Sequence, residues 1–194
     1  MLFEHWIYST AIAIIVGMLY YRFTGREYPW IIIMSAYAPD FDIFVDTILR
    51  RVGVTLLIDG IPIRHGSFHN IVVLLLFAFS VALLLHPIGI KFIDSFIFAS
   101  IGFGAHLFED ALVFNPGYAF FWPLSNQRLG IGIMGYNPNL YGIADIGVLL
   151  VGITAVVICV GIRVIYEGSS WIRYLLIPRV FPSKVTANVM MLRR

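Results

Sequence analysis

Charged residues are scarce in this chain, and their scarcity excludes an ordinary soluble domain. Asp, Glu, Lys and Arg make up 12% of the 194 residues, whereas hydrophobic residues make up 60%. A soluble domain carries about 25% charged residues, and here the apolar residues fall in long unbroken runs. Because one membrane span needs roughly 20 mostly apolar residues, the length fits several spans and leaves no room for a separate soluble domain.

Other features are missing as well, and each absence removes a class of protein. The single cysteine, Cys159, excludes an intramolecular disulfide. A net charge of +2 is too small to indicate a nucleic-acid partner. Glu4 stands where a signal peptide would be basic, so we expect the first apolar run to be a retained anchor. No His-Glu-x-x-His segment is present, which argues against an intramembrane metalloprotease.

Five apolar runs are long enough to be membrane spans, and they predict an all-α integral membrane protein built as a bundle of about five transmembrane helices. The runs cover residues 6–23, 30–49, 71–85, 92–114 and 143–166. Residues 1–168 then form one transmembrane helical domain. Residues 169–194 form a basic cytoplasmic tail that starts, at Trp171 and Ile172, as an interfacial segment.

The orientation follows from the basic residues, because Lys and Arg favour the cytoplasmic side. Five spans place the two termini on opposite sides of the membrane. With the C-terminus inside, the inner residues are Arg22, Arg26, Lys91, Arg163, Arg173, Arg179, Lys184, Arg193 and Arg194, and the outer ones are Arg50, Arg51, Arg64 and Arg128. The excess on the inner side predicts an outer N-terminus and an inner C-terminus.

The ionisable residues, which were not used to build this topology, collect near one membrane face. The layer holds His5, Asp40, Asp42, Asp46, His65, His69, His106, Glu109, Asp110 and Asp145. An ionisable group at the centre of a membrane helix costs about 2.5–3.5 kcal/mol on insertion scales. So many of them at one depth indicate ion pairs, a wet cavity or a bound ion. The clustering depends on the number of spans and not on which side is inside.

The spacing of these residues predicts a metal site. His106 and Asp110 are four residues apart, so they share a helix face, and His65 and His69 have the same spacing. Pro39 disfavours a regular helix, and a break there turns Asp40 and Asp42 into one cavity. Imidazole and carboxylate ligands suit zinc or another divalent ion. The ligands are too many for one tetrahedral ion, so two or three ions are expected in a polar, metal-binding cavity near one membrane face.

Simpler interpretations apply to several members of the layer. Asp46 lies one helical turn from Arg50 and is predicted to form an ion pair with it. Asp94, close to Lys91, is interpreted as a surface pair, and Asp145 as a helix N-cap. For Glu109 three roles stay open: a catalytic base, a residue behind the metal ligands, or the partner of an arginine.

Four segments together resemble the YdjM-like membrane-bound metal-dependent hydrolases. They are Ala38-Pro39-Asp40-Phe41-Asp42, Arg64-His65-Gly66-Ser67-Phe68-His69, His106-Leu107-Phe108-Glu109-Asp110 and Trp122-Pro123-Leu124-Ser125. That family carries an early histidine and then a Pro-Asp-x-Asp, an Arg-His, a His-x-x-x-Asp and a Trp-Pro element in this order. The resemblance covers the chain from His5 to about Ser125.

The resemblance implies a set of metal ligands, because this family is distantly similar to the zinc-dependent phospholipase C and single-strand nuclease superfamily. By that analogy the ligands are His5, Asp40, Asp42, His69, His106 and Asp110, and His65 is a ligand or a phosphate contact. Asn70 stands where the family often has serine. A second His-x-x-x-Glu pair, present in the soluble enzymes, is missing here, which argues against a full three-metal cluster.

The leading hypothesis is therefore a membrane-embedded metal-dependent hydrolase, with residues 1–168 as the hydrolase domain and zinc as the favoured ion. Its substrate would be a phosphoester of a membrane lipid or another membrane-associated, phosphorylated molecule, with no nucleic-acid partner expected. Asp42 or Glu109 would act as the base, and Arg64 and Arg128 would bind the phosphate. The site would lie on the extracytoplasmic face of the inner membrane. No oligomeric state is predicted.

Two other hypotheses stay open. The first is an intramembrane carrier of protons or metal ions, since Asp and His also mark ion pathways. A carrier needs polar residues through the whole depth, and we expect the inner side to lack a matching cluster. The second is a structural or assembly protein whose polar layer consists of ion pairs, with Arg50, Arg51 and Arg64 as partners.

Overall fold

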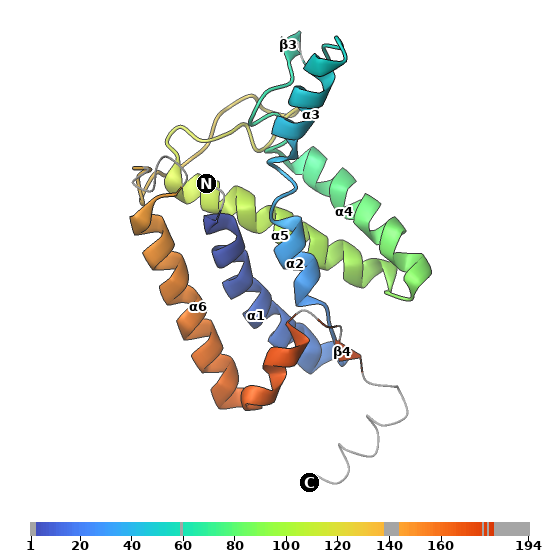
Figure 1. The fold of residues 1–194 in the computed structure, drawn as a ribbon, viewed down its shortest axis with the longest axis vertical. Coiled ribbons are helices and arrows are strands. Elements are labelled where there is room, and N and C mark those ends of the chain that lie inside the picture. Colours follow the sequence, from blue (N-terminus) through green and yellow to red (C-terminus); the bar gives the residue numbers. More distant parts are fainter. Residues whose placement is uncertain (1–2, 59, 138–143, 176, 178, 181–194) are drawn as a thin grey trace.

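Helices form nearly all of the architecture, and the computed structural model describes residues 3–58, 60–137, 144–175, 177 and 179–180 (Figure 1). The helices are α1 (Glu4–Thr24), α2 (Pro29–Ser35), α3 (Phe41–Arg51), α4 (Ile71–Leu85), α5 (Phe92–Val113) and α6 (Ile146–Glu167), with the 3-10 helices η1 (His86–Ile88) and η2 (Ser169–Tyr174). Short antiparallel strand pairs join β1 (Arg26–Glu27) to β4 (Arg179–Val180) and β2 (Leu57–Ile58) to β3 (Ile61–Pro62). The predicted all-α class is confirmed.

Four of the described helices are long and apolar enough to cross a membrane: α1, α4 continued by η1, α5 and α6. Polar side chains mark where two of them begin. The side chain of Asn70 accepts a hydrogen bond from the backbone N–H of Val73, and that of Asp145 accepts one from Val148. These contacts satisfy N–H groups that have no partner inside the helix, and they confirm the predicted N-cap role of Asp145.

The predicted second span, residues 30–49, is wrong as a single membrane helix. The run divides into α2, which ends at Ser35, and α3, which begins at Phe41. Pro39 lies in the turn between them, where it removes a backbone N–H and restricts Ala38. The break predicted at Pro39 is thus confirmed, whereas the count of five long membrane helices is not met by the described residues.

The short helix α2 nevertheless carries the chain back along the bundle. It packs against both α1 and α5, and in Figure 1 it runs from the end of α1 at Thr24 toward the end at Glu4. The start of α1, the end of α5, and the starts of α4 and α6 therefore gather at one end of the bundle. This shared end is the single layer that the sequence predicts.

Close packing of α2 on α5 depends on Gly102. A Cβ atom at this position would overlap the carbonyl oxygen of Ile32 and lie 2.8 Å from the Cβ of Ser35. The neighbouring side chains Ile32, Phe98 and Phe103 are fully buried. Glycine therefore lets the backbone of α2 approach α5 one helical turn before His106, and this approach brings the end of α2 to the site.

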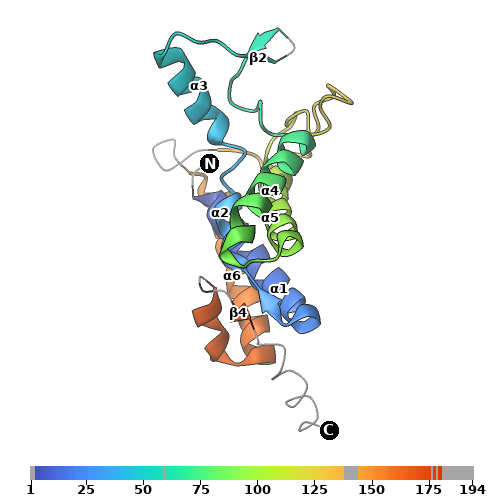
Figure 2. The same ribbon diagram turned by 90° about the vertical axis from the view of Figure 1, so that its right-hand side faces the viewer.

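The helix α3 and the β2–β3 hairpin extend beyond this end of the bundle, as both views show (Figures 1 and 2). The predicted pair on α3 is confirmed, since Arg50 Nε lies 2.7 Å from Asp46 Oδ1.

The segment after α6 begins with η2. Trp171 is buried, and the Arg163 guanidinium carbon lies 4.6 Å from the centre of its indole ring. Its neighbour Ile172 is exposed. The interfacial role of this segment stays a prediction, and the basic residues Lys184, Arg193 and Arg194 lie outside the described residues.

Candidate metal centre

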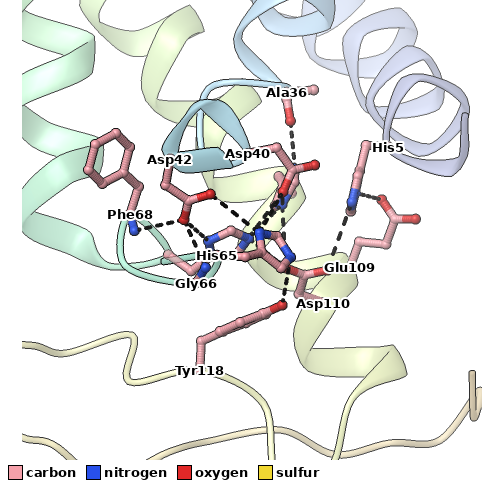
Figure 3. A network of polar contacts seen from close by, with 12 residues as sticks. His5, Ala36, Asp40, Asp42, His65, Gly66, Phe68, Glu109, Asp110 and Tyr118 are labelled. Carbon is pink, nitrogen blue, oxygen red and sulfur yellow. Dashed lines mark hydrogen bonds and ion pairs between the residues drawn. The ribbon is translucent and has the colours of Figure 1, made fainter. Parts of the chain in front are cut away.

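Four histidines and four carboxylates from separate parts of the chain meet at the end of the bundle where α1 starts (Figure 3). His5 comes from the first turn of α1, and the last two turns of α5 supply three members. The turn after α2 and the first residues of α3 supply two aspartates, and the loop before α4 supplies two histidines. The cluster is His5, Asp40, Asp42, His65, His69, His106, Glu109 and Asp110. Every residue predicted as a metal ligand lies in it.

At its centre, four side-chain atoms point toward one another. His69 Nε2 lies 3.1 Å from His106 Nε2, and Asp110 Oδ2 lies 3.2 and 3.4 Å from these two nitrogens. Asp40 Oδ1 lies 3.5 and 3.7 Å from the same two nitrogens. A tetrahedral zinc ion with ligand bonds of about 2.0–2.2 Å separates its ligand atoms by roughly 3.3–3.6 Å. The atoms of His69, His106 and Asp110, which lie 3.1–3.4 Å apart, thus have spacings close to those of three ligands of one such ion.

In His106 and His5, the Nδ1 atom is hydrogen-bonded to an acceptor outside the centre of the cluster. The Nε2 atom of each ring is therefore left to bind an ion. His106 Nδ1 donates to the carbonyl oxygen of Ala36, 2.7 Å away. His5 Nδ1 donates to Glu109 Oε2, also at 2.7 Å. A histidine ligand commonly donates its second N–H to a carbonyl or carboxylate, which fixes the ring and its tautomer. Both contacts have this form.

Asp42 organises the loop before α4. One of its oxygens accepts hydrogen bonds from the backbone N–H groups of Gly66 (2.8 Å) and Phe68 (3.2 Å). His65 Nδ1 lies 3.3 Å from its other oxygen, and His69 Nδ1 lies 3.6 Å from the first. Burial opposes ionisation of Asp42, but His65, His69 and the Phe68 N–H together hold its pKa below the ordinary value. The carboxylate is thus ionised and holds both histidines in place.

The predicted catalytic bases lie behind the histidines. Asp42 and Glu109 are both fully buried, and neither is among the described residues that line the adjoining cavity. Glu109 contacts His5, and Asp42 contacts His65 and the loop. This geometry favours orientation of the ligands over the predicted role as a base, and it selects the second of the three roles left open for Glu109.

Charge is unbalanced in the cluster. Among the described residues, the ion pairs of its four carboxylates are all with histidines, and none is with Lys or Arg. Buried carboxylates without a cation are costly. Burial opposes protonation of His69, but Asp110, Asp40 and Asp42 raise its pKa to about 10. The cluster therefore takes up positive charge, as a proton or as a metal ion.

Three overlapping groups of side chains can each hold an ion. His69, His106 and Asp110 form the first, Asp40, His65 and His69 the second, and His5, Asp40 and His106 the third. In the third group the rings of His5 and His106 are stacked, with centroids 3.6 Å apart. The groups share members, and the donor set of imidazoles and carboxylates is one that zinc accepts.

A cavity of about 550 Å³ adjoins the cluster on the side of His65. Arg64 and Arg128, the predicted phosphate-binding residues, both line it, together with Asn70 and Trp122. Arg128 Nε donates to the carbonyl oxygen of Gly117 at 2.9 Å, which holds the side chain against the loop after α5. The described lining has two arginines and no carboxylate, so it suits an anion.

Sequence reasoning missed Tyr118 and the carbonyl of Ala36. Tyr118 lines the cavity, and its ring centroid is 4.2 Å from that of His69. Burial and the nearby Asp110, Asp40 and Asp42 raise the pKa of its hydroxyl above the ordinary value, so the phenol stays protonated. It lies in an irregular Gly- and Pro-rich loop without periodicity, so the spacing of residues gives no sign of it.

The interpretation of Asp94 as a surface pair with Lys91 is wrong. Asp94 is fully buried and accepts hydrogen bonds from Arg26 Nε (2.6 Å) and the hydroxyl of Tyr20 (2.7 Å).

Comparison with known proteins adds the family. A family model described as YdjM inner membrane protein matches residues 1–180, which include the whole cluster and the lining of the cavity. No curated protein and no solved structure matches the chain.

Proposed function

The chain belongs to the YdjM inner membrane protein family, and we propose that it is a metal-dependent hydrolase that cleaves a phosphoester of a lipid or another membrane-associated substrate. Its family and its four apolar helices make it an integral inner membrane protein. The observation that carries the proposal is the convergence of two imidazole nitrogens, 3.1 Å apart, with one oxygen of Asp110 and one of Asp40, each 3.2–3.7 Å from both nitrogens. This cluster lies at the end of the membrane helices, beside a cavity lined by two arginines.

His69, His106 and Asp110 would hold the first ion, and Asp40, His65 and His5 extend the set to the two or three ions proposed. Zinc is the favoured ion for these ligands. A bound divalent ion supplies Lewis-acid polarisation of a phosphoryl oxygen and a water that loses its proton near neutral pH.

The other residues of the site would orient the metal ligands or bind the substrate. Glu109 fixes the ring of His5, and the carbonyl of Ala36 fixes that of His106. Asp42 holds the loop that carries His65 through the backbone N–H groups of Gly66 and Phe68. Arg64 and Arg128 would neutralise the phosphate oxygens of a substrate in the cavity, because guanidinium groups bind phosphate through charge-assisted hydrogen bonds.

A lipid is the favoured source of the phosphoester because the cavity lies at the end of the helices that cross the membrane. We also propose that this end faces the extracytoplasmic side. Arg22, Arg26 and Lys91 belong to the ends of α1 and α5 that are remote from the cluster, and basic residues favour the cytoplasmic side.

Hydrolysis by the purified protein tests the proposal. Aryl phosphate esters and short-chain phospholipids are offered in detergent, first after chelation and then with added zinc. We expect hydrolysis only with metal, and Asp110→Asn should lower it by about a hundredfold or more, since even residues behind the ligands typically contribute 10–100-fold.

The matched control is Asp46→Asn, which removes a carboxylate of α3 that lies outside the cluster and pairs with Arg50. It should leave hydrolysis unchanged. Absence of hydrolysis of every ester with zinc present, or full activity of Asp110→Asn, would contradict the proposal.

The carrier hypothesis receives no comparable support. A carrier needs accessible polar groups through the depth of the bundle. The buried carboxylates at the other end, Glu27 and Asp94, are already paired with Arg163 and Arg26. Those pairs resemble structural contacts and not a second binding site.

A further inference from the structure

Tyr118 lies beside the cluster, with its hydroxyl directed toward His65 (Figure 3). Its ring faces His69 at a centroid distance of 4.2 Å and a tilt of 33°. Its hydroxyl lies 3.3 Å from His65 Nε2, and the residue also lines the cavity. Tyr118 and His65 therefore contact both the cluster and the space in which a substrate would bind.

Two loops hold Tyr118 in this position. Its carbonyl oxygen accepts a hydrogen bond from the N–H of Leu129 at 2.9 Å, which ties two parts of the loop after α5 together. On the other side lies Gly66, whose φ of +94° favours glycine. A Cβ at Gly66 would lie 2.6 Å from Cε1 of the tyrosine ring. The tyrosine ring therefore packs directly against the backbone of Gly66. Any side chain at position 66 would occupy the space that the ring takes up.

The direction of the hydrogen bond between Tyr118 and His65 depends on how His65 is used. Nδ1 of His65 faces the carboxylates, 3.3 Å from Asp42 Oδ1 and 3.8 Å from Asp40 Oδ1, whereas Nε2 faces the tyrosine hydroxyl. A neutral imidazole has one donor and one acceptor nitrogen. When Nδ1 acts as a ligand atom, Nε2 carries the proton and donates to the tyrosine oxygen. The phenolic O–H is then free to donate elsewhere.

We propose that Tyr118 is a substrate-binding residue whose hydroxyl donates a hydrogen bond to a phosphoryl oxygen of a phosphate group in the cavity. The inference rests on the proposed function. Arg64 and Arg128 supply positive charge in the cavity lining, and the tyrosine supplies an uncharged donor next to the proposed metal ligand His69. The hydroxyl places the phosphorus beside the cluster, whereas the arginines alone would hold the phosphate without setting its position.

The test compares Tyr118→Phe with Tyr136→Phe. The first substitution keeps the ring that packs on His69 and removes only the hydroxyl. The second removes a hydroxyl from the same connection between α5 and α6, at a residue that is not part of the described cavity lining. Zinc content per chain, melting temperature, and the Kd values of inorganic phosphate and of dioctanoyl phosphatidate are measured on zinc-loaded protein in detergent.

We expect Tyr118→Phe to keep its zinc and its melting temperature and to bind both probes about tenfold to a hundredfold more weakly, the range for a hydrogen bond to a charged group. Tyr136→Phe should bind like the wild type. If the wild type prefers the phosphatidate over inorganic phosphate, a lipid is the source of the phosphate, and the reverse preference indicates a soluble phosphate. With either preference, the role of the hydroxyl is supported if Tyr118→Phe binds the preferred probe more weakly than the wild type does.

Unchanged affinity of Tyr118→Phe for both probes would overturn the inference, and so would loss of zinc from this variant, which would make the tyrosine part of the metal cluster. A wild type that binds zinc but neither probe would overturn the inference while leaving the metal centre intact. A wild type that binds no zinc would instead remove the proposed function.

Discussion

The two ends of the helix bundle bury carboxylates in opposite ways. At the end where α1 finishes, Glu27 pairs with Arg163 and Asp94 pairs with Arg26. At the end where α1 starts, the ion pairs of Asp40, Asp42, Glu109 and Asp110 among the described residues are all with histidines. Arginine always carries its positive charge, whereas a neutral histidine offers a lone pair. The first arrangement is a closed structural contact, and the second is a group of side chains that could hold a metal ion.

The arginine end pairs its buried carboxylates with its own cations. Arg163 is fully buried, donates to the carbonyl oxygen of Ile14 at 3.1 Å and stacks over Trp171. Gly17 leaves room for the pair, since a Cβ there would lie 3.2 Å from Glu27 Oε2 and 3.4 Å from Arg163 Nη1. Buried polar atoms without a hydrogen-bond partner occur at both ends, so the ends differ in how charge is paired. They include Arg163 Nε and Trp171 Nε1 at the arginine end, and His69 Nδ1, Glu109 Oε1 and Asp110 Oδ2 at the histidine end.

The largest effect on stability is expected from Arg163→Met. The substitution removes the buried cation that pairs with Glu27. Breaking a buried ion pair typically costs 3–5 kcal/mol, while the zinc content of the folded fraction should stay at the wild-type value. Chemical unfolding in detergent measures the change, and the double variant Arg163→Met/Glu27→Met should regain most of it. A loss of zinc from folded Arg163→Met would show that the two ends are not separate.

A smaller effect, confined to the histidine end, is expected from Glu109→Gln. The amide cannot stabilise the His5 ring as the carboxylate does, so zinc should bind about 10–100-fold more weakly. Competition with a chromogenic chelator measures the affinity, and unfolding of the metal-free protein should change little. Wild-type affinity in this variant would mean that His5 is not a ligand or needs no orienting partner.

The smallest of the three effects tests how the fold positions the cluster. Gly102→Ala pushes α2 away from α5, because its Cβ meets the backbone of Ile32. Overpacking typically costs about 1–3 kcal/mol, and the shift should also weaken zinc binding, since the end of α2 holds His106 through Ala36. The matched control is Gly104→Ala on the same helix, where a Cβ makes only an ordinary 3.7 Å contact with Leu74. Equal behaviour of the two variants would contradict this account of α2.

Much of this comparison can be predicted from the sequence, because membrane helices and i, i+4 ligand pairs are local patterns. The apolar runs at 71–85 and 92–114 correspond closely to α4 and α5, and the His106/Asp110 pair follows from spacing alone. The break at Pro39 also follows from local chemistry. Since Asp40 and Asp42 directly follow that break, their convergence on the histidines could be anticipated as well.

The rest depends on contacts between distant residues. Asp94 was assigned to its sequence neighbour Lys91, but its partners Arg26 and Tyr20 lie 68 and 74 positions away. The role of Glu109 depends on His5, which is 104 positions away. Tyr118 belongs to an irregular loop, where no periodicity relates a residue to a face. Such contacts are set by how the helices pack, which a single sequence does not reveal.

Metal analysis of the purified protein tests the central claim most directly. Wild-type protein and His106→Ala are purified in detergent, supplied with zinc, freed of excess ion and measured by inductively coupled plasma mass spectrometry. The account predicts at least one tightly bound divalent ion per wild-type chain and a clear loss of bound ion in His106→Ala, with helical content unchanged by circular dichroism. A wild-type protein that retains no zinc, manganese or similar ion, or a His106→Ala variant that retains as much as the wild type, would contradict it.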